Sequence, residues 1–397
     1  MGERTGKIMS LYKSASGRDV NHASSSTLDL FKGCRRKFYL EKIQGWKEKG
    51  KKGSLEFGKA VESAVQFFYE NGCKPGDAVD HFKMIWLKFA EIPLKFTAQE
   101  NSWQDLYKMG SEMLKLFEVI YDTLPIKHPK FQLEYRKKVF PGSQYDELEF
   151  MGYVDILSTL DDGDRIIVDM KTAKQPLDLT PNMLAMDGQL KKYSWLTGVQ
   201  KVAFLNFVKA GNPDTFKKGT GITLIEDEGE HKAGETFVVY KVETQEEEDG
   251  ASLVQLTLAA PKTVQLMDEE LDKISGKGSK EAKEKIVARY SEEKLLFVVD
   301  RPSVTKTRIQ YVQAYIGADD AAEVGQAVGI DMLAVKQAGD MGVYPMDGGV
   351  KFPNNACVYC KFAPICLKNK EATEQTLVQI KADSDDWLRE LETEEVE

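Results

Sequence analysis

The chain has 397 residues, of which 42% are hydrophobic and 29% are charged. This length suffices for one large α/β domain with appendages or for two modest domains, and the composition is that of an ordinary globular protein. No apolar run approaches the roughly 18 residues that a membrane span needs, and residues 1–20 contain no segment resembling a secretory signal. We therefore expect a cytoplasmic protein that does not enter the membrane.

The net charge of −9 is concentrated at one end of the chain. Residues 382–397 hold eight acids and one arginine, so removing them from the 63 acids and 54 bases leaves 55 and 53. Within this nearly neutral body, residues 32–52 carry nine lysines and arginines against two glutamates. A local basic stretch of this kind can bind a polyanion, so the overall charge does not exclude nucleic acid as a partner.

The first part of the chain predicts helices after a polar leader, residues 1–23. Ser24 to Thr27 offer N-caps for a helix over 28–43, and three further apolar patterns at helical spacing follow at 53–72, 76–92 and 103–124. The pattern then changes to alternation, which predicts strands at 131–140, 147–160 and 165–173. A helix over 183–198 and a strand over 201–210 complete the α/β core, residues 24–210. This order predicts a central mixed sheet flanked by helices.

Residues 211–293 are polar and rich in glycine, lysine and glutamate, and we interpret them as an insertion with strands of its own at 236–242 and 252–258. Residues 294–370 return to the core pattern. In that part we predict strands at 294–300 and 307–316 that rejoin the core, a helix over 319–339 and a cysteine-rich segment. Residues 371–397 comprise the end of a helix and the acidic tail.

Two carboxylates and a lysine form the candidate catalytic set. Asp169 and Lys171 end the apolar strand at 165–173, and residues two apart on a strand point to the same face. Asp155 lies on the preceding strand, and a short turn would bring it beside Asp169. Carboxylates that hold one or two divalent ions can neutralise a phosphodiester and lower the pKa of an attacking water, and a lysine can orient that water.

An acid-x-base triplet alone means little, because about eight or nine are expected by chance in this composition. The following helix strengthens the interpretation. Gln189 and Tyr193 are four residues apart and share one helical face, where an amide and a phenol suit contacts with a phosphate backbone or a base. The set therefore comprises Asp155, Asp169, Lys171, Gln189 and Tyr193.

In this order the motifs resemble those of the RecB-like branch of the PD-(D/E)XK nucleases, which includes RecB, AddB and the CRISPR-associated adaptation exonucleases. That family has a helix with G-xxx-H, followed by G-x-x-D, D/E-x-K and Q-xxx-Y. The corresponding segments are Gly58-KAV-Glu62, Gly152-YV-Asp155, Asp169-M-Lys171 and Gln189-LKK-Tyr193. The resemblance covers about residues 24–210 and 295–370.

The resemblance implies a restriction-endonuclease-like α/β core with a helical N-terminal part and a C-terminal iron–sulfur segment. It implies a DNA exonuclease that uses Mg²⁺ or Mn²⁺, with Glu62, Asp155, Asp169 and Met170 as the metal ligands. Glu62 departs from the family, which usually has a histidine at that position. Glu134 is a further acid near the site, although a cross-strand surface partner for a lysine explains it equally well.

Three cysteines fall within ten residues, at 357, 360 and 366, which indicates metal or cluster ligation. Cys34 is the natural fourth ligand if the two ends of the chain meet. The resemblance supports a 4Fe–4S cluster on Cys34, Cys357, Cys360 and Cys366, since AddB and the adaptation exonucleases pair one early cysteine with a late C-xx-C-x5-C segment. Four cysteines also suit a structural zinc, so that alternative stays open. Cys73 stands apart.

The function that we predict is exonuclease action on DNA ends, single-stranded or duplex, in recombination, repair or viral DNA processing. Phe38, Tyr39 and Trp46 interleave the basic stretch, which could line a passage for one strand. A helicase or a single-strand-binding or recombination protein would be a partner in trans. The alternative is a weakly catalytic or non-catalytic DNA-binding subunit of a larger complex, and a viral protein would act in the host cytoplasm.

Overall fold

The computed structural model describes residues 9–92, 94–96, 102–177, 181–209, 215–246, 252–274, 280–293, 296–298, 303–346 and 356–380. Its centre is a six-stranded sheet in the order β16-β10-β9-β8-β3, with β7 also paired to β8. The strands of this sheet are β3 (His22–Ala23), β7 (Lys127–Lys138), β8 (Glu149–Thr159), β9 (Arg165–Ala173), β10 (Lys201–Val208) and β16 (Arg308–Tyr315).

The central sheet is mixed, as the sequence predicts. Strands β7, β8 and β9 form an antiparallel meander, whereas β10 runs parallel to β9 and β3 runs parallel to β8. The parallel pair follows from the crossover through α7 (Gly188–Thr197), since a strand–helix–strand unit returns the second strand in the same direction. At the far edge, β16 pairs antiparallel with β10.

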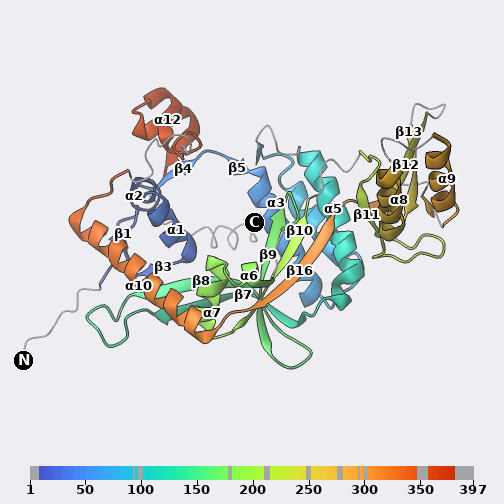
Figure 1. Ribbon diagram of the computed structural model, residues 1–397. Helices are drawn as coiled ribbons and strands as arrows, with labels where there is room; N and C mark the ends of the chain where they lie inside the picture. Colours follow the sequence, from blue (N-terminus) through green and yellow to red (C-terminus); the bar gives the residue numbers. More distant parts are fainter. Residues whose placement is uncertain are drawn as a thin grey trace, which may run out of the picture.

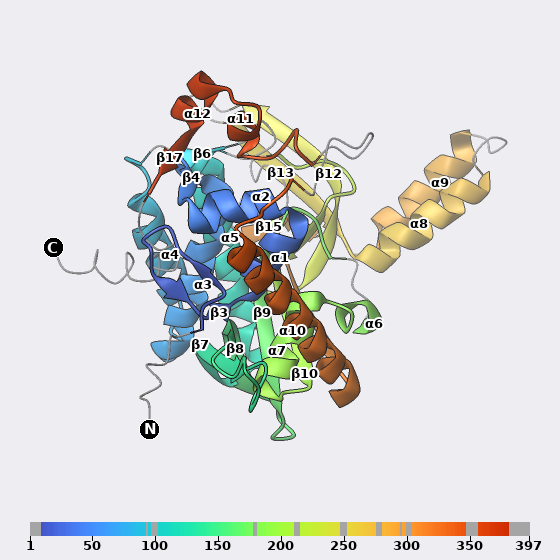
Figure 2. The same ribbon diagram turned by 90° about the vertical axis from the view of Figure 1, so that its left-hand side faces the viewer.

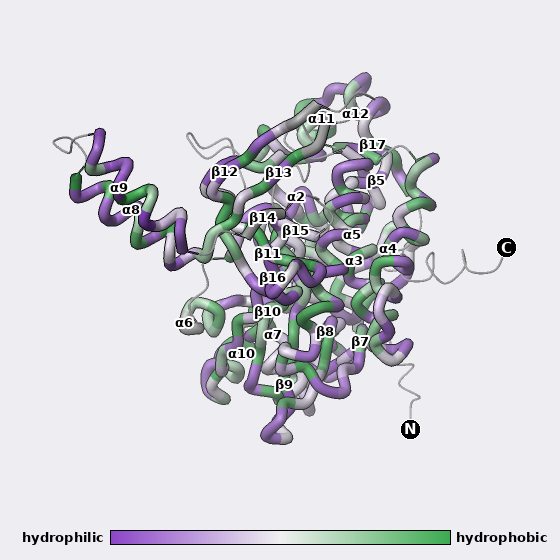
Figure 3. Tube along the Cα trace, turned by 90° about the vertical axis from the view of Figure 1, so that its right-hand side faces the viewer, coloured by the Kyte–Doolittle hydropathy of each residue, from purple (hydrophilic) through white to green (hydrophobic). Residues whose placement is uncertain are grey.

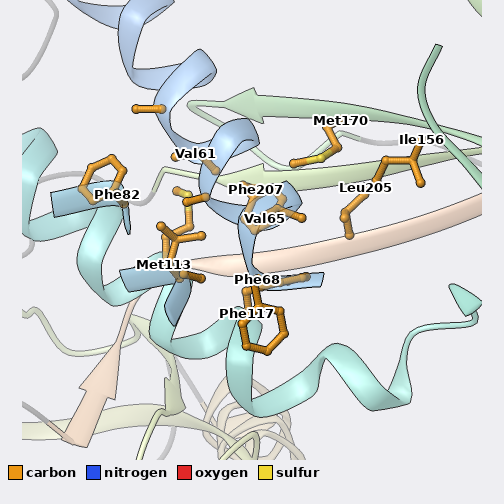
Figure 4. Close-up of a cluster of buried hydrophobic side chains, with 14 of the residues drawn as sticks. Val61, Val65, Phe68, Phe82, Met113, Phe117, Ile156, Met170, Leu205 and Phe207 are labelled. Atoms are coloured by element: carbon orange, nitrogen blue, oxygen red, sulfur yellow. The ribbon is translucent and has the colours of Figure 1, made fainter. Parts of the chain in front are cut away.

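Three helices cover one face of this sheet: α3 (Gly53–Glu70), α4 (Asp77–Leu87) and α5 (Trp103–Ile120). Their apolar sides meet alternate residues of β9 and β10, such as Val168, Met170 and Leu205, in the largest buried cluster (Figure 4). The intervening strand residues, such as Ile167 and Phe204, face the opposite cluster. This period of two assigns Asp169 and Lys171 to the opposite face as well.

The opposite face is covered by α7, by α6 (Pro181–Leu184) and by the long helix α10 (Ala318–Met341), which Figure 1 shows along that side of the sheet. Lys192 of α7 is buried, and its ammonium donates to the side chains of Ser25 and Asp29. These contacts tie α7 to α1 (Ser25–Gly33), the first helix of the chain.

The inserted residues form a second, five-stranded sheet in the order β14-β13-β12-β11-β15. Its strands are β11 (Gly221–Leu224), β12 (Thr236–Glu246), β13 (Ser252–Ala259), β14 (Leu296–Val298) and β15 (Val304–Thr305). The expected return to the core at 294–300 is wrong, because β14 pairs with β13. The sequence of β14 is apolar enough for either sheet, and only the pairing distinguishes them. The return begins at β16.

Two helices of the insertion, α8 (Pro261–Ile274) and α9 (Lys280–Ser291), form a hairpin that projects away from the body (Figure 2). They contact each other, and α8 also contacts β12. Hydrophilic and hydrophobic residues alternate along this arm (Figure 3). The described residues contain no helix with the length and apolar character of a membrane span.

The N-terminal helix expected over 28–43 is divided into three pieces, which is a correction. The cap is as predicted, since the Ser24 side chain accepts from Thr27 N. The helix α1 stops at Gly33, Cys34 adopts an extended conformation, and the chain continues as α2 (Arg35–Phe38) and one π-helical turn, η1 (Tyr39–Ile43). The break places Cys34 at the junction between α1 and α2.

A segment near the start of the described residues pairs with one near their end. Strand β4 (Trp46–Glu48) pairs antiparallel with β17 (Leu377–Gln379), and Leu40, Phe362 and Leu377 form a small buried cluster. The remaining elements are β1 (Tyr12–Lys13), β2 (Asp19–Val20), β5 (Lys51–Lys52), β6 (Leu94–Lys95), η2 (Tyr121–Thr123), α11 (Ala363–Cys366) and α12 (Lys370–Thr376). The acidic tail at 382–397 lies outside the described residues.

Candidate active site

The candidate catalytic residues lie where two central strands separate. The ladder between β8 and β9 ends at the pair Ile156↔Val168, and Asp155 and Asp169 are the next residues on each strand. In place of a ladder bond, the Met170 N–H donates to Asp155 Oδ2 at 2.9 Å. This bond fixes the Asp155 carboxylate across the opening. The predicted juxtaposition of the two aspartates is therefore present in the structure.

Asp169 is a fully buried carboxylate, with 0% of its surface exposed. Its Oδ2 forms an ion pair with Lys171 Nζ at 2.6 Å. Apart from that ion pair, neither of its oxygens has a hydrogen-bond partner among the residues that the structure describes. A buried carboxylate is costly unless it is paired or bound to a metal, and Lys171 pairs with only one of the two oxygens, so the other is available to a ligand.

The third acid, Glu62, reaches the site from α3. This helix comes close to β9 at Gly58, where an added Cβ would lie 3.3 Å from Thr172 Oγ1. Glu62 lies one turn further along the helix, and its Oε1 accepts a hydrogen bond from the Gln132 amide of β7. The glycine at the start of the G-xxx-E segment thus permits the approach that brings Glu62 to the aspartates.

The pKa shifts of the three acids show that they share one site. Burial raises the pKa of Glu62 to about 7, and the charges of Asp155 and Asp169 add to the shift. Burial, followed by the charge of Asp155, raises the pKa of Asp169 to about 7. Burial also raises the pKa of Asp155, although the Met170 N–H opposes this. Each acid would be stabilised in its charged form by a bound cation.

Lys171, Gln189 and Tyr193 form a chain of contacts beside the acids. Lys171 Nζ donates to Gln189 Oε1 at 3.3 Å, and Gln189 Nε2 donates to the Tyr193 hydroxyl at 2.9 Å. The helix α7 packs closely here because Gly152 has no side chain: a Cβ would lie 3.1 Å from Tyr193 Cε1. This chain of contacts begins at Asp169, which forms the ion pair with Lys171.

Met170, the fourth predicted ligand, has its side chain in the apolar cluster on the other face and its N–H bonded to Asp155. The main-chain carbonyl is therefore the one oxygen that it can offer. In the described part of the chain, no three His, Cys, Asp or Glu side chains are close enough together to enclose a metal ion. The three acids instead contact Gln132, Met170 N and Lys171.

Two residues near the site are absent from the set predicted from the sequence. Gln132 lies on β7 between the pairs Phe131↔Ile156 and Leu133↔Val154, which places it opposite Asp155. Asp187 caps α7 by accepting from Gln189 N, and its charge raises the pKa of Asp169. Helix-cap spacing could have located Asp187, whereas the position of Gln132 depends on strand register.

Glu134 is a surface partner, as the alternative interpretation held, but of an arginine and a tyrosine rather than a lysine. Its carboxylate accepts from Arg136 Nε at 2.5 Å and from the Tyr153 hydroxyl at 2.7 Å. These two hydrogen bonds hold the pKa of Glu134 below its usual value. We therefore leave Glu134 out of the site.

The four predicted cluster ligands all lie in what we call the clasp, residues 34–48 with 356–380, although among the residues that the structure describes no three of them are close enough together to enclose a metal ion. Burial raises the pKa of the Cys366 thiol, and the neighbouring thiols of Cys360, Cys34 and Cys357 raise it further. The four cysteines therefore interact electrostatically, although Cys34 is far from the other three in the sequence. Cys73 lies at the end of α3, against the core beside the sheet.

The aromatic residues of the basic stretch do not form a free stacking surface, which is a correction. Phe38 is fully buried, with 0% exposure, in a cluster with Tyr12 and Phe31. Tyr39 stacks on Tyr344 at 5.0 Å between ring centroids. Trp46 packs against the buried cluster of the clasp. The spacing of these residues reflects the packing of the N-terminal helices.

Comparisons with known proteins bear on the whole chain. A search of curated proteins found no match. A solved structure named "Crystal structure of SSO0001" aligns over 88% of this chain and 87% of that chain, with 10% identity and a TM-score of 0.27. That superposition carries no argument about the site. A family model of the PD-(D/E)XK nuclease superfamily, whose members are typically nucleases, matches residues 22–367. The chain belongs to the PD-(D/E)XK nuclease superfamily.

Proposed function

We propose that the protein is a metal-dependent exonuclease that hydrolyses phosphodiester bonds at DNA ends. One observation carries the proposal: the fully buried carboxylate of Asp169, whose only side-chain partner among the described residues is Lys171, lies with Asp155 and Glu62 at the point where two strands separate. Burial raises the pKa of all three acids, and repulsion from neighbouring acids adds to the shifts of Glu62 and Asp169. A divalent cation removes the repulsion, which explains why such an arrangement persists.

The donor set fits a hard cation. Glu62, Asp155 and Asp169 offer carboxylate oxygens, and Met170 offers its main-chain carbonyl, all of which suit Mg²⁺ or Mn²⁺ better than softer ions. A divalent ion held there would neutralise phosphate charge and lower the pKa of a bound water. The fit requires modest side-chain movement, since Lys171 now occupies Asp169 Oδ2 at 2.6 Å.

Lys171 is placed to orient the attacking water. Its ammonium lies between Asp169 and Gln189, and the charge of Asp169 raises its pKa, although burial opposes this. The group therefore stays protonated, so it acts as a hydrogen-bond donor and a positive charge near the phosphate rather than as a base. Gln189 in turn holds Tyr193, and we assign these two to the DNA backbone or the terminal base.

We also propose a 4Fe–4S cluster on Cys34, Cys357, Cys360 and Cys366, with zinc as the alternative. The thiols lie close enough to influence one another electrostatically, and thiolates suit either group. Such a group would join α1 and α2 to the segment at 356–366, beside the short ladder between β4 and β17. We assign it a structural role.

Action at DNA ends rests on the motif order shared with the RecB-like branch. A role in recombination, repair or viral DNA processing, with a helicase or single-strand-binding partner, extends the same resemblance. The tail at 382–397 is acidic enough to compete with DNA for a basic surface or to dock such a partner.

The test is a cleavage assay on single-stranded and blunt duplex DNA labelled separately at each 5′ and 3′ end. With Mg²⁺ or Mn²⁺ we expect mononucleotides or short products to be released from one polarity, and no cleavage of covalently closed circles. Chelator should abolish the reaction. Cutting of circles would identify an endonuclease, and DNA binding without any cleavage would favour the DNA-binding subunit.

A further inference from the structure

We infer that Gln132 is a positioning residue of the metal site, which holds the Glu62 carboxylate in the orientation needed to bind the cation. The inference rests on the proposed function and adds to it a third strand, β7, as part of the site. Glu62 is the acid contributed by a helix rather than by the sheet, so its carboxylate depends most on a neighbour for its orientation.

The contact itself is specific. The Gln132 amide donates from Nε2 to Glu62 Oε1, across 70 residues of sequence. Gln132 is flanked by the pairs Phe131↔Ile156 and Leu133↔Val154, so the strand holds it beside Asp155. An amide donor that engages one carboxylate oxygen leaves the other oxygen to ligate a cation. Such supporting hydrogen bonds commonly decide the affinity of a metal site.

The backbone of Gln132 is the second observation. Its φ is +48°, in the left-handed region that residues other than glycine rarely adopt. A strained conformation in a paired strand persists because the surrounding structure maintains it, and such residues gather at functional sites. At Gln132 the unusual backbone coincides with the hydrogen bond to Glu62.

The same strand offers a matched control. His128, four residues earlier on β7, has the same φ of +48° and is also exposed. His128 lies in the irregular part of β7 between Lys127 and Lys130, outside the pairs that flank Gln132. Together with Tyr69 and Tyr121 it lines a separate cavity of about 390 Å³. Glycine at either position relieves the left-handed backbone, but only the change at Gln132 removes a donor to Glu62.

The experiment compares Gln132→Gly, His128→Gly and the wild type in the full chain. Mn²⁺ affinity is measured without DNA by electron paramagnetic resonance, and cleavage is followed over a Mg²⁺ titration. We expect Gln132→Gly to weaken Mn²⁺ binding and raise the half-saturating Mg²⁺ concentration about ten-fold, with kcat at saturating metal within about two-fold of wild type. His128→Gly should change neither. Both variants should gain thermal stability by similar amounts.

A double-mutant cycle shows whether Gln132 acts through Glu62. In a Glu62→Ala background, Gln132→Gly should cause no further loss of metal affinity, because the hydrogen bond is already absent. If the glycine variant does not fold, Gln132→Asn decides the question. Asparagine tolerates a left-handed backbone but is one methylene too short to reach Glu62.

Wild-type metal affinity in Gln132→Gly or Gln132→Asn would overturn the inference, as would an equal loss in the wild-type and Glu62→Ala backgrounds. A fall in kcat alone would assign Gln132 to the substrate instead, and would also overturn it. Failure of the proposed function gives a different result: the wild type itself would then bind no Mn²⁺, or Asp169→Asn would bind it as tightly.

Discussion

The carboxylate site (Glu62, Asp155, Asp169 and Lys171) and the clasp both join segments that are far apart in the sequence, but they are held in different ways. The carboxylate site lies among strands with long ladders, and α3 fixes its helical acid through a core that includes Val61 and Val65. The clasp has a three-residue ladder and a small cluster of three buried side chains, since its Phe38 belongs to the larger cluster around Phe31.

This difference leads us to expect that the carboxylate site is preorganised by the fold, whereas the clasp depends on a bound ligand. Burial of a large apolar surface can hold repelling acids in place before a metal binds. The repulsion lowers the free energy of unfolding, and metal binding raises it again. A small cluster such as Leu40, Phe362 and Leu377 contributes far less, so we expect the clasp to depend on the group bound by its thiols.

The largest effect is expected from removing either aspartate. Asp155→Ala or Asp169→Ala should lower the cleavage rate about a thousand-fold, because the transition state loses the charge stabilisation that a held cation provides. Folding, measured by circular dichroism, and DNA binding, measured by fluorescence anisotropy, should remain near wild type. Loss of folding in both variants would mean that the core is less preorganised than its ladders indicate.

The clasp should respond in the opposite way. Cys34→Ser should remove the bound group and destabilise the chain by about 2–5 kcal/mol, since metal ligation contributes folding free energy in small clasps. Iron, sulfide and zinc analysis with the visible spectrum identify the group, and thermal melting gives the loss.

Cys73→Ser is the matched control, because Cys73 lies away from the clasp, three residues beyond the end of α3, where it packs against the core. Iron and sulfide in the wild type but not in Cys34→Ser would support the cluster, and one tightly bound zinc would support the alternative. Equal metal content in Cys34→Ser and in the wild type would contradict the four-thiol assignment.

The cost of the carboxylate site should appear in the stability of the metal-free protein. The pKa of Asp169 rises from 3.8 to about 7 on folding, so the folded state retains a proton that the unfolded state loses between those pH values. Stability should therefore fall as pH rises from about 4 to about 7. Asp169→Asn removes the contribution of this residue to the pH dependence, while Glu62 and Asp155, whose pKa values are also raised, keep theirs. The substitution should stabilise the metal-free protein at pH 8 by roughly 2 kcal/mol.

Urea unfolding of the metal-free proteins across that pH range checks the expectation. Saturating Mg²⁺ should stabilise the wild type at pH 8 but not Asp169→Asn. If the asparagine variant is less stable than the wild type at pH 8 without metal, the buried acid is compensated by contacts other than its ion pair with Lys171.

The smallest effect concerns the contacts of α7. Gln189→Ala removes the acceptor of Lys171 and the donor to Tyr193, and we expect about a ten-fold loss of kcat/KM with little change in metal affinity. Tyr193→Phe keeps the ring against Gly152 and removes only the hydroxyl, so its loss should be smaller. A change in Mn²⁺ affinity in Gln189→Ala would place this residue among the groups that support the metal.

Much of the central fold could be predicted from local patterns. Alternation identified β7, β8 and β9, and the short turn between β8 and β9 predicted that Asp155 and Asp169 would meet. Pairing between distant segments could not be predicted in the same way. The apolar sequence of β14 fits either sheet, and nothing local to Gly33 and Cys34 announced that the helix breaks there.

The same limit applies to the site. Motif spacing located Glu62 and the two aspartates because each lies within a short pattern on one element. Gln132 could not be predicted, because its contact with Glu62 depends on the register of β7 and on a positive φ that the local sequence does not indicate. The prediction that the aromatic residues of the basic stretch line a passage for DNA is wrong for a related reason. The spacing of residues in the sequence shows neither their burial nor their contacts, and Phe38 is a core residue.

The most direct test of the account is Mn²⁺ binding to the metal-stripped protein, measured by electron paramagnetic resonance for the wild type, Asp169→Asn and Cys34→Ser. We predict tight binding in the wild type and its loss in Asp169→Asn, with binding retained in Cys34→Ser at temperatures where that variant stays folded. Binding that survives Asp169→Asn, or that disappears in folded Cys34→Ser, would contradict a preorganised metal site at the divergence of β8 and β9.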